Sequence, residues 1–213
     1  MAPVRTIVTF GAGPGIGNHV SAEFASHGFN HVILLARNEQ RLSNQDAPFV
    51  FKASPNVKLD TLPLDLSDTP SIPGVLKKID DLTQGEDLEV VFFNAARIKP
   101  SGVLDVSIEE IEEDFKQLKK TNSSSKPSLL VTNSFLPRVP IPQLLSLSLA
   151  KAGQRNMMHA FNLAFGESGV HAGLINVGGV VAPESKNLNP KNIAKRAFAF
   201  FEAGEGLDVD INE

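Results

Sequence analysis

The chain has 213 residues, a formal net charge of −4 and a calculated pI near 5.8. Apart from the patch Lys116 to Lys120, which follows a run of acids, no strong stripe of Lys and Arg occurs, so we expect no nucleic-acid partner. Cysteine is absent, which excludes disulfides and a thiol nucleophile, and the histidines show no metal-ligand spacing. The N-terminus has no signal-peptide pattern, and no apolar run reaches the ~20 residues of a membrane helix, so we expect a cytoplasmic protein.

Short β-branched runs alternate with helical patterns along the chain, which predicts βαβ units around a parallel sheet. Each run is nearly continuous in apolar residues, as expected for strands buried on both faces. The predicted strands are residues 4–10, 31–36, 57–64, 88–94, 127–133, 170–177 and, at an edge, 207–211. The predicted helices are one that carries Ile16, Val20 and Phe24 and ends at Gly28, a core helix over 143–166, and an amphipathic helix over 189–201. These patterns indicate the α/β class, a doubly wound Rossmann fold with helices on both faces, as one domain over residues 1–213.

The segment GAGPGIG, residues 11–17, joins the first predicted strand to the first helix. A dinucleotide pyrophosphate needs close backbone approach and free amides at a helix N-terminus, and glycines permit both. The spacing G-x-G-x-x-G fails because Ile16 occupies its last position, whereas G-x-x-x-G-x-G fits through Gly11, Gly15 and Gly17. We therefore predict that Gly11, Gly13, Gly15, Ile16 and Gly17 bind a nucleotide, with an ordinary glycine-rich turn as the alternative.

This spacing resembles the cofactor loop of the short-chain dehydrogenase/reductases. Two further segments are similar to that family: Leu64-Asp65-Leu66 after the third strand, and Phe93-Asn94-Ala95-Ala96 after the fourth, where the family has Asn-Asn-Ala-Gly. The resemblance implies that Asp65 hydrogen-bonds the adenine of a nicotinamide cofactor and that Asn94 helps to form its site. Either residue could instead cap a helix or satisfy a turn.

The end of the second strand distinguishes NAD from NADP(H). An acidic residue there would bind the ribose hydroxyls of NAD, whereas an arginine suits a 2′-phosphate. Arg37 follows the strand and no carboxylate does, which favours NADP(H), although Arg37 could be a solvated residue. The loop 177–183 is similar to the family's nicotinamide loop, which implies backbone contacts from Gly179 and Val181 to the cofactor.

The resemblance places the chemistry on the predicted core helix, where the family carries a Tyr and a Lys one turn apart, with a Ser upstream. Lys151 fits the lysine and Ser134 fits the serine, but Leu147 occupies the tyrosine position and the chain has no tyrosine. Lys151 could still hydrogen-bond the nicotinamide ribose, and a water held by Lys151 and Ser134 could supply the proton. The alternatives are a lysine lying along an amphipathic helix and a serine in a strand-end turn.

We therefore expect an NADP(H)-dependent oxidoreductase that acts on a small organic carbonyl, alcohol or activated alkene. Two alternatives stay open: a catalytically inactive NADP(H)-binding sensor or partner protein, and a cofactor-free isomerase or cyclase on the same fold. Leu147 together with the ending Leu188-Asn189-Pro190 resembles fungal members of the family.

The crossover between residues 94 and 127 is shorter than the family's, which usually holds a long helix that helps to form the dimer. Only residues 107–120 have a helical pattern, with a narrow apolar stripe. We expect any homo-oligomer to be weakened by this shortened helix. A compact natural variant and a truncated gene model would both produce such a sequence.

Overall fold

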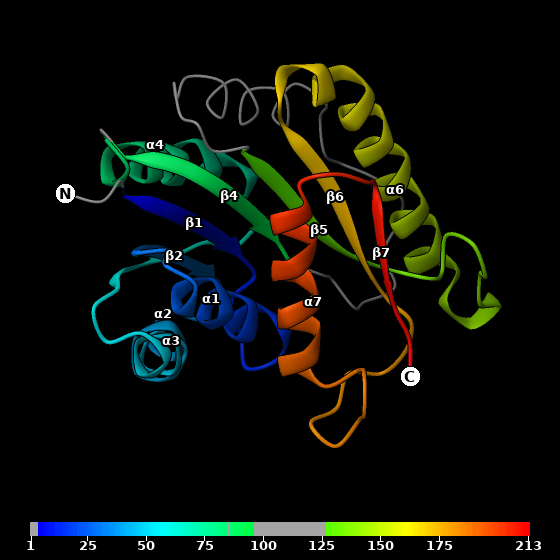
Figure 1. Cartoon of the computed structure of the whole chain (residues 1–213), viewed down its shortest axis with the longest axis horizontal. Coiled ribbons are helices and arrows are strands. Elements are labelled where there is room, and N and C mark those ends of the chain that lie inside the picture. Colours follow the sequence, from blue (N-terminus) through cyan, green and yellow to red (C-terminus); the bar gives the residue numbers. More distant parts are fainter. Residues whose placement is uncertain (1–3, 85, 96–126) are drawn as a thin grey trace.

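The computed structural model describes residues 4–84, 86–95 and 127–213. Its centre is a single sheet in which every strand pair is parallel (Figure 1). The strand order is β3-β2-β1-β4-β5-β6-β7. The strands are β1 (Arg5–Phe10), β2 (His31–Ala36), β3 (Lys58–Pro63), β4 (Asp87–Phe93), β5 (Ser128–Ser134), β6 (His171–Val177) and β7 (Asp208–Ile211). The predicted parallel sheet is confirmed, and the bounds of each strand differ by at most one residue from those expected.

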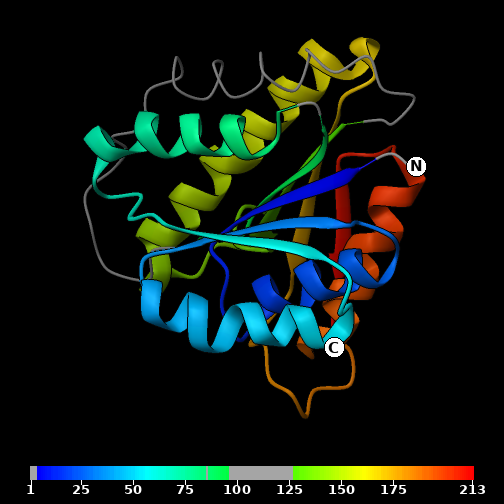
Figure 2. The same cartoon turned by 90° about the vertical axis from the view of Figure 1, so that its left-hand side faces the viewer.

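Helices cover both faces of the sheet, as a doubly wound fold requires (Figure 2). One face carries α1 (Ile16–Ser26), α3 (Ala47–Ala53) and α7 (Pro190–Ala203), and the other carries α4 (Ile72–Leu82) and α6 (Leu145–Phe165). A short helix α2 (Glu39–Arg41) and a π-helical turn (Leu42–Asp46) lead into α3. The core between α1 and α7 is aromatic: the Phe24 ring lies 5.0 Å from the Phe198 ring and 5.3 Å from the Phe201 ring.

Helix α1 ends as its sequence predicts. Gly28 adopts a φ of +90°, which a residue with a side chain rarely tolerates. The amide of Phe29 donates to the carbonyl of Phe24 at 3.2 Å, and the two rings pack 5.0 Å apart. This reversal of the chain, with its accompanying hydrophobic contact, is a Schellman motif. It sends the chain from α1 into β2.

Helix α6 is less buried than predicted. The sequence indicated a core helix, yet its buried residues are Ser148, Met158 and Phe161, and Leu145 and Leu163 are 57% and 74% exposed. The reason is that one face packs against β5 and β6, whereas the apolar residues lie on several faces. The predicted helix over 107–120 and the shortened crossover lie outside the described residues.

The strand order reverses between β1 and β4: β2 and β3 extend the sheet on one side of this pair, and β5, β6 and β7 extend it on the other. Open α/β sheets bind their ligands at this switch point, outside the carboxyl ends of the strands. In the part of the chain that the structure describes, no helix is long and apolar enough to cross a membrane.

Candidate functional site

The residues singled out from the sequence lie at the carboxyl edge of the sheet. This follows from the parallel topology, because every strand then ends at the same edge. The glycine-rich loop follows β1, and the other candidates follow the remaining strands or lie on α6: Arg37 after β2, Asp65 after β3, Asn94 after β4, Ser134 at the end of β5, Gly179 and Val181 after β6, and Lys151 on α6. Residues far apart in the sequence thus lie along the same end of the sheet.

Two glycines of the loop are required by close packing. Gly11 has a φ of +88°, and a Cβ there would lie 2.6 Å from the backbone nitrogen of Ala95. A Cβ at Gly17 would lie 2.5 Å from the carbonyl oxygen of Gly11. The loop therefore presses against both the start of α1 and the segment after β4, which leaves no room for a methyl group.

Gly15 has a different environment. It is the N-cap of α1, and a Cβ placed on it would meet no atom within 4 Å. The first turn of a helix has amides without intrahelical acceptors, and its dipole favours an anion. The amides of Ile16 and Gly17 lie in that turn. The arrangement offers an open face and helix N-terminal donors to a phosphate, although the predicted binding by these residues stays a prediction.

Asn94 connects the ends of three strands. Its Nδ2 donates to the Gly11 carbonyl at 3.1 Å, and its Oδ1 accepts from Thr132 Oγ1 at 2.9 Å. The Thr132 carbonyl in turn accepts from Lys151 Nζ at 2.7 Å. These hydrogen bonds, through Thr132 and Asn94, link the amine of Lys151 on α6 to the glycine-rich loop.

Lys151 lies with its ammonium group largely buried. Burial lowers the pKa of Lys151 from 10.5 to about 8, since desolvation disfavours the charged form. Nζ also donates to Gln154 Oε1 at 3.0 Å, and no carboxylate in the described ranges pairs with it. Leu147, half-buried, lies one turn earlier on the same helix. Near neutral pH this amine can thus gain or lose a proton with little cost.

Three other candidates have local structural roles or open surroundings. Ser134 Oγ accepts from the amide of Leu136 at 3.3 Å, and Asp65 Oδ1 accepts from the amide and the hydroxyl of Ser67 at 3.0 and 2.7 Å. Both are turn contacts of the kind that the sequence left open. Arg37 is exposed where β2 ends, so its guanidinium is accessible to a ligand.

The loop after β6 approaches the same edge. A Cβ on Gly179 would lie 2.8 Å from Leu188 Cδ1, so the backbone there packs closely on the segment before α7. Val181 packs against the core, whereas Val180 is 84% exposed. The packing of Gly179 and Val181 anchors this loop, and its backbone can face a ligand.

The sequence did not reveal three polar residues that hold the glycine-rich loop: Asn18, Arg41 and Asp46. Arg41 NH2 donates to the Ala12 carbonyl at 2.7 Å, and Asn18 Oδ1 accepts from the Gly13 amide at 2.8 Å. The only signal for Arg41 was its position four residues after Arg37, and nothing local relates Asp46 to Asn18.

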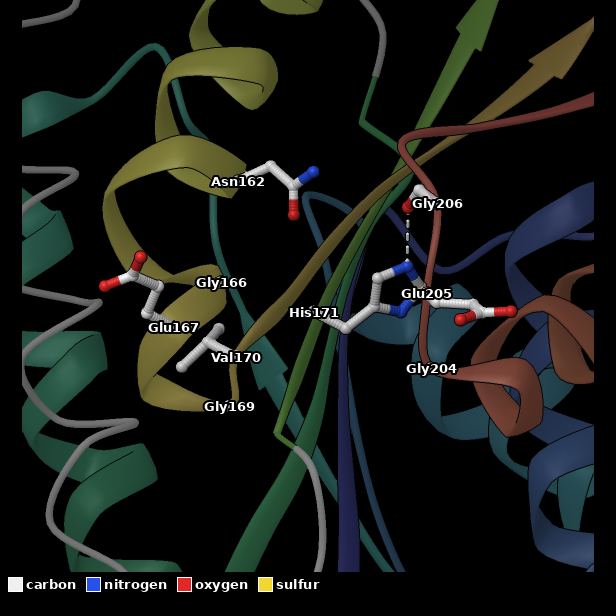
Figure 3. A pocket seen from close by; sticks show the side chains of 9 residues that line it. All are labelled: Asn162, Gly166, Glu167, Gly169, Val170, His171, Gly204, Glu205 and Gly206. Carbon is white, nitrogen blue, oxygen red and sulfur yellow. Dashed lines mark hydrogen bonds between the residues drawn. The ribbon is translucent and has the colours of Figure 1, made fainter.

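A hollow of about 360 Å³ lies at the opposite end of the sheet, near the amino end of β6 (Figure 3). It is lined by the end of α6, the start of β6 and the turn between α7 and β7. There His171 Nε2 lies 2.9 Å from the Gly206 carbonyl oxygen. Because parallel sheets of this kind bind cofactors at the carboxyl ends of their strands, this hollow is no part of the candidate site. The described residues contain no cluster of three or more His, Asp or Glu that could hold a metal ion.

The sequence profile of the short chain dehydrogenases matches residues 5–193. The chain belongs to the short-chain dehydrogenase family. A search of curated protein sequences found no significant match.

Several solved structures share the fold of this chain. An alcohol dehydrogenase from the archaeon Thermococcus sibiricus, complexed with 5-hydroxy-NADP, is 21% identical with a TM-score of 0.75, covering 97% of this chain and 95% of its own. The NADPH-bound short chain oxidoreductase of Pseudomonas aeruginosa PAO1, described as containing an atypical catalytic center, is 19% identical with a TM-score of 0.73 and coverages of 96% and 95%. The reductase/Diels-Alderase MalC of Malbranchea aurantiaca is 16% identical with a TM-score of 0.75 and coverages of 98% and 95%.

Proposed function

We propose that this short-chain dehydrogenase is an NADP(H)-dependent oxidoreductase acting on a small organic carbonyl, alcohol or activated alkene. The observation that carries the proposal is the open N-terminus of α1 at Gly15, where an added Cβ would meet no atom within 4 Å, together with the exposed Arg37 after β2, the strand that pairs with β1. The helix N-terminus would bind the pyrophosphate, and Arg37 would bind the 2′-phosphate. Two of the similar structures are named as complexes with NADPH or an NADP derivative.

The cofactor, when bound, supplies or accepts a hydride at its nicotinamide ring. Lys151 would hydrogen-bond the nicotinamide ribose, and Gly179 and Val181 would contact the carboxamide through their backbone. Ser134 and Lys151 would hold a water that gives or takes the substrate proton. Lys151 would return the proton that this water gives up, or accept the one that it gains, and a pKa of about 8 suits that exchange near neutral pH.

A second function is favoured by Leu147 and by the absence of tyrosine from all 213 residues. A protein that binds NADP(H) without turning it over would keep the glycine-rich loop and Arg37 but would not need a phenol. The same residue favours a cofactor-free isomerase or cyclase as a third possibility. Leu147 and the segment Leu188-Asn189-Pro190 support placing the chain among fungal members of the family that lack the tyrosine.

Calorimetric titration of NADPH and NADH against the purified protein tests the cofactor assignment. We expect NADPH to bind about tenfold or more tightly, since a guanidinium–phosphate contact contributes roughly 1.5–3 kcal/mol. Arg37→Ala should remove this preference and leave NADH binding unchanged. Arg196→Ala, an exposed arginine on α7, is the matched control. Equal affinities in the wild type would overturn the choice of NADP(H).

Turnover separates the oxidoreductase from its alternatives. NADPH oxidation is followed with a panel of ketones, aldehydes and conjugated enals. Oxidation with any member of the panel supports the reductase, whereas tight binding without oxidation supports the non-catalytic protein. A folded protein that binds neither nucleotide would support the cofactor-free enzyme.

A further inference from the structure

The first half of the glycine-rich loop is fully occupied by hydrogen bonds within the protein. The amides of Gly11 and Ala12 both donate to the Leu35 carbonyl at 2.9 Å, and the Gly11 carbonyl accepts from Asn94. The Ala12 carbonyl accepts from Arg41, and the Gly13 carbonyl accepts from the amide of Asn18 at 3.0 Å. This half of the loop is therefore a scaffold, and the donors for a ligand lie beyond it.

Asp46 is at the centre of the side chains that hold this scaffold. Its Oδ1 accepts from Asn18 Nδ2 at 2.7 Å, and its Oδ2 accepts from Arg41 Nε at 2.9 Å. Asp46 is 1% exposed and Asn18 is 2% exposed, so water cannot replace these contacts. A buried carboxylate requires such partners, and here it has one on each oxygen.

The contacts of Asp46 fix the two side chains that reach the loop. A carboxylate only accepts, so Asn18 must present its Nδ2 to Asp46 and its Oδ1 to the Gly13 amide, at 2.8 Å. Arg41 is similarly held, because one edge of its guanidinium faces Asp46 while NH2 reaches the Ala12 carbonyl. Asn38 caps α2 by accepting from the Arg41 amide at 2.8 Å, which places the backbone of Arg41.

We propose that Asp46 is a positioning residue for the cofactor: through Asn18 and Arg41 it holds the glycine-rich loop in the shape that receives a pyrophosphate. The inference deepens the proposed function and rests on it for its link to nucleotide binding. Asp46 itself touches no nucleotide. Loss of the Asp46 carboxylate weakens the binding of every ligand that needs the pyrophosphate site. The affinity falls by the same factor whether or not the ligand carries a 2′-phosphate.

The test uses Asp46→Asn. The amide nitrogen of the new side chain would face a donor, either Arg41 Nε or Asn18 Nδ2, so one of the two hydrogen bonds is lost. We expect the Kd values of NADPH, NADH and ADP-ribose each to rise about tenfold, the loss of one charge-assisted hydrogen bond. The ratio of the NADPH and NADH affinities stays constant. Adenosine 2′-monophosphate, which has no pyrophosphate, binds within about twofold of its wild-type affinity.

Two further variants separate positioning from general stability. Glu89→Gln removes a comparable ion pair. Buried Glu89 on β4 accepts two hydrogen bonds from Arg5, at 2.7 and 2.9 Å, near the amino ends of the central strands and away from the candidate site. It should lower the melting temperature and leave all four Kd values unchanged. Arg41→Lys keeps the charge but has a single nitrogen for two acceptors, so it should reproduce the pattern of Asp46→Asn even if the latter folds poorly.

Hydrogen exchange at the Gly13 amide in the nucleotide-free protein reports on the loop directly. Exchange should accelerate in Asp46→Asn and in Arg41→Lys, and not in Glu89→Gln. Unchanged exchange, or Kd values that stay at the wild-type level, would overturn the inference. A loss confined to NADPH would also overturn it, since Arg41 would then contact the 2′-phosphate. Wild-type protein that binds no nucleotide would instead refute the proposed function, and the exchange rates would still decide whether Asp46 holds the loop.

Discussion

Gly17 lies directly against Gly11: a Cβ at residue 17 would stand 2.5 Å from the Gly11 carbonyl oxygen. Neither atom belongs to a flexible side chain, so the backbone itself would have to move. We predict that Gly17→Ala lowers the free energy of unfolding by about 2 kcal/mol, as overpacking does elsewhere, and abolishes measurable NADPH binding. Urea unfolding and calorimetry measure the two effects.

Gly15→Ala is the matched comparison, because the added methyl group meets no atom within 4 Å beyond the two neighbouring residues of the chain. We expect it to cost much less stability than Gly17→Ala, while the methyl group obstructs the surface that a pyrophosphate would approach. Full NADPH affinity in Gly15→Ala would show that the ligand lies elsewhere.

Restoring a phenol at residue 147 should create or strengthen reductase activity. A tyrosine there lies one turn before Lys151, whose ammonium form would lower the phenol pKa. We predict that Leu147→Tyr raises the rate of NADPH-dependent carbonyl reduction about 10²-fold, the usual contribution of a general acid. Leu147→Phe supplies the ring without the hydroxyl and should give no increase. Equal rates in the two variants would show that the hydroxyl does not reach the substrate.

The buried Lys151 makes stability depend on alkaline pH. The pKa of Lys151 is lowered by burial to about 8 from 10.5, so between these values the folded chain binds fewer protons than the unfolded chain. Stability therefore rises with pH across this window, by up to about 3 kcal/mol. The measurement is urea unfolding at a series of pH values that spans about 7.5 to 10.5. The absence of tyrosine and cysteine removes two other groups that titrate there. Lys151→Met should remove this rise, and a rise that persists in the variant would assign it to another group.

Glu86 should govern part of the acid stability. Burial would raise the pKa of Glu86, but hydrogen bonds from His31, Lys58 and Thr6 outweigh it and lower the pKa below 4.5. Its contribution is thus fully present above about 4.5 and is lost as the pH falls through the folded value. We expect Glu86→Gln to be less stable near neutral pH by up to about 1 kcal/mol, since solvent screens part of the interaction, with the gap closing in acid. Glu205→Gln, at an exposed site, should match the wild type throughout. A gap that stays constant with pH would exclude this linkage.

The inner strands, such as β2 and β6, were predictable because each is a short apolar run that the parallel sheet buries on both faces, whereas β3 and β7 at the edges are only partly buried. Helix α6 shows the limit of the same reasoning. Its sequence reveals that Leu145, Leu149 and Leu163 are apolar, but not which face of the helix meets the sheet. Residues 39–53 were not assigned to helices, since a π-helical turn and Pro48 interrupt the regular 3.6-residue period.

The location of the site was predictable for a related reason: residues that follow parallel strands share one edge. What holds the site in shape was not. Asp46 and Asn18 are 28 residues apart and contact each other only because α1 and the turn before α3 pack together on the same face. The turn roles of Ser134 and Asp65 were open alternatives in the sequence, because the hydrogen bonds with Leu136 and Ser67 depend on the local backbone conformation.

The two edge strands of the sheet, β3 and β7, carry features that disfavour pairing with a further strand. β3 carries Lys58 and Asp60 and ends at Pro63, a residue that cannot donate to a further strand. β7 carries Asp208 and Asp210, which pair with Arg155 and Arg138 at 2.8 and 2.6 Å. An incoming strand would have to desolvate these charges, so fibrillar stacking through the sheet borders is disfavoured.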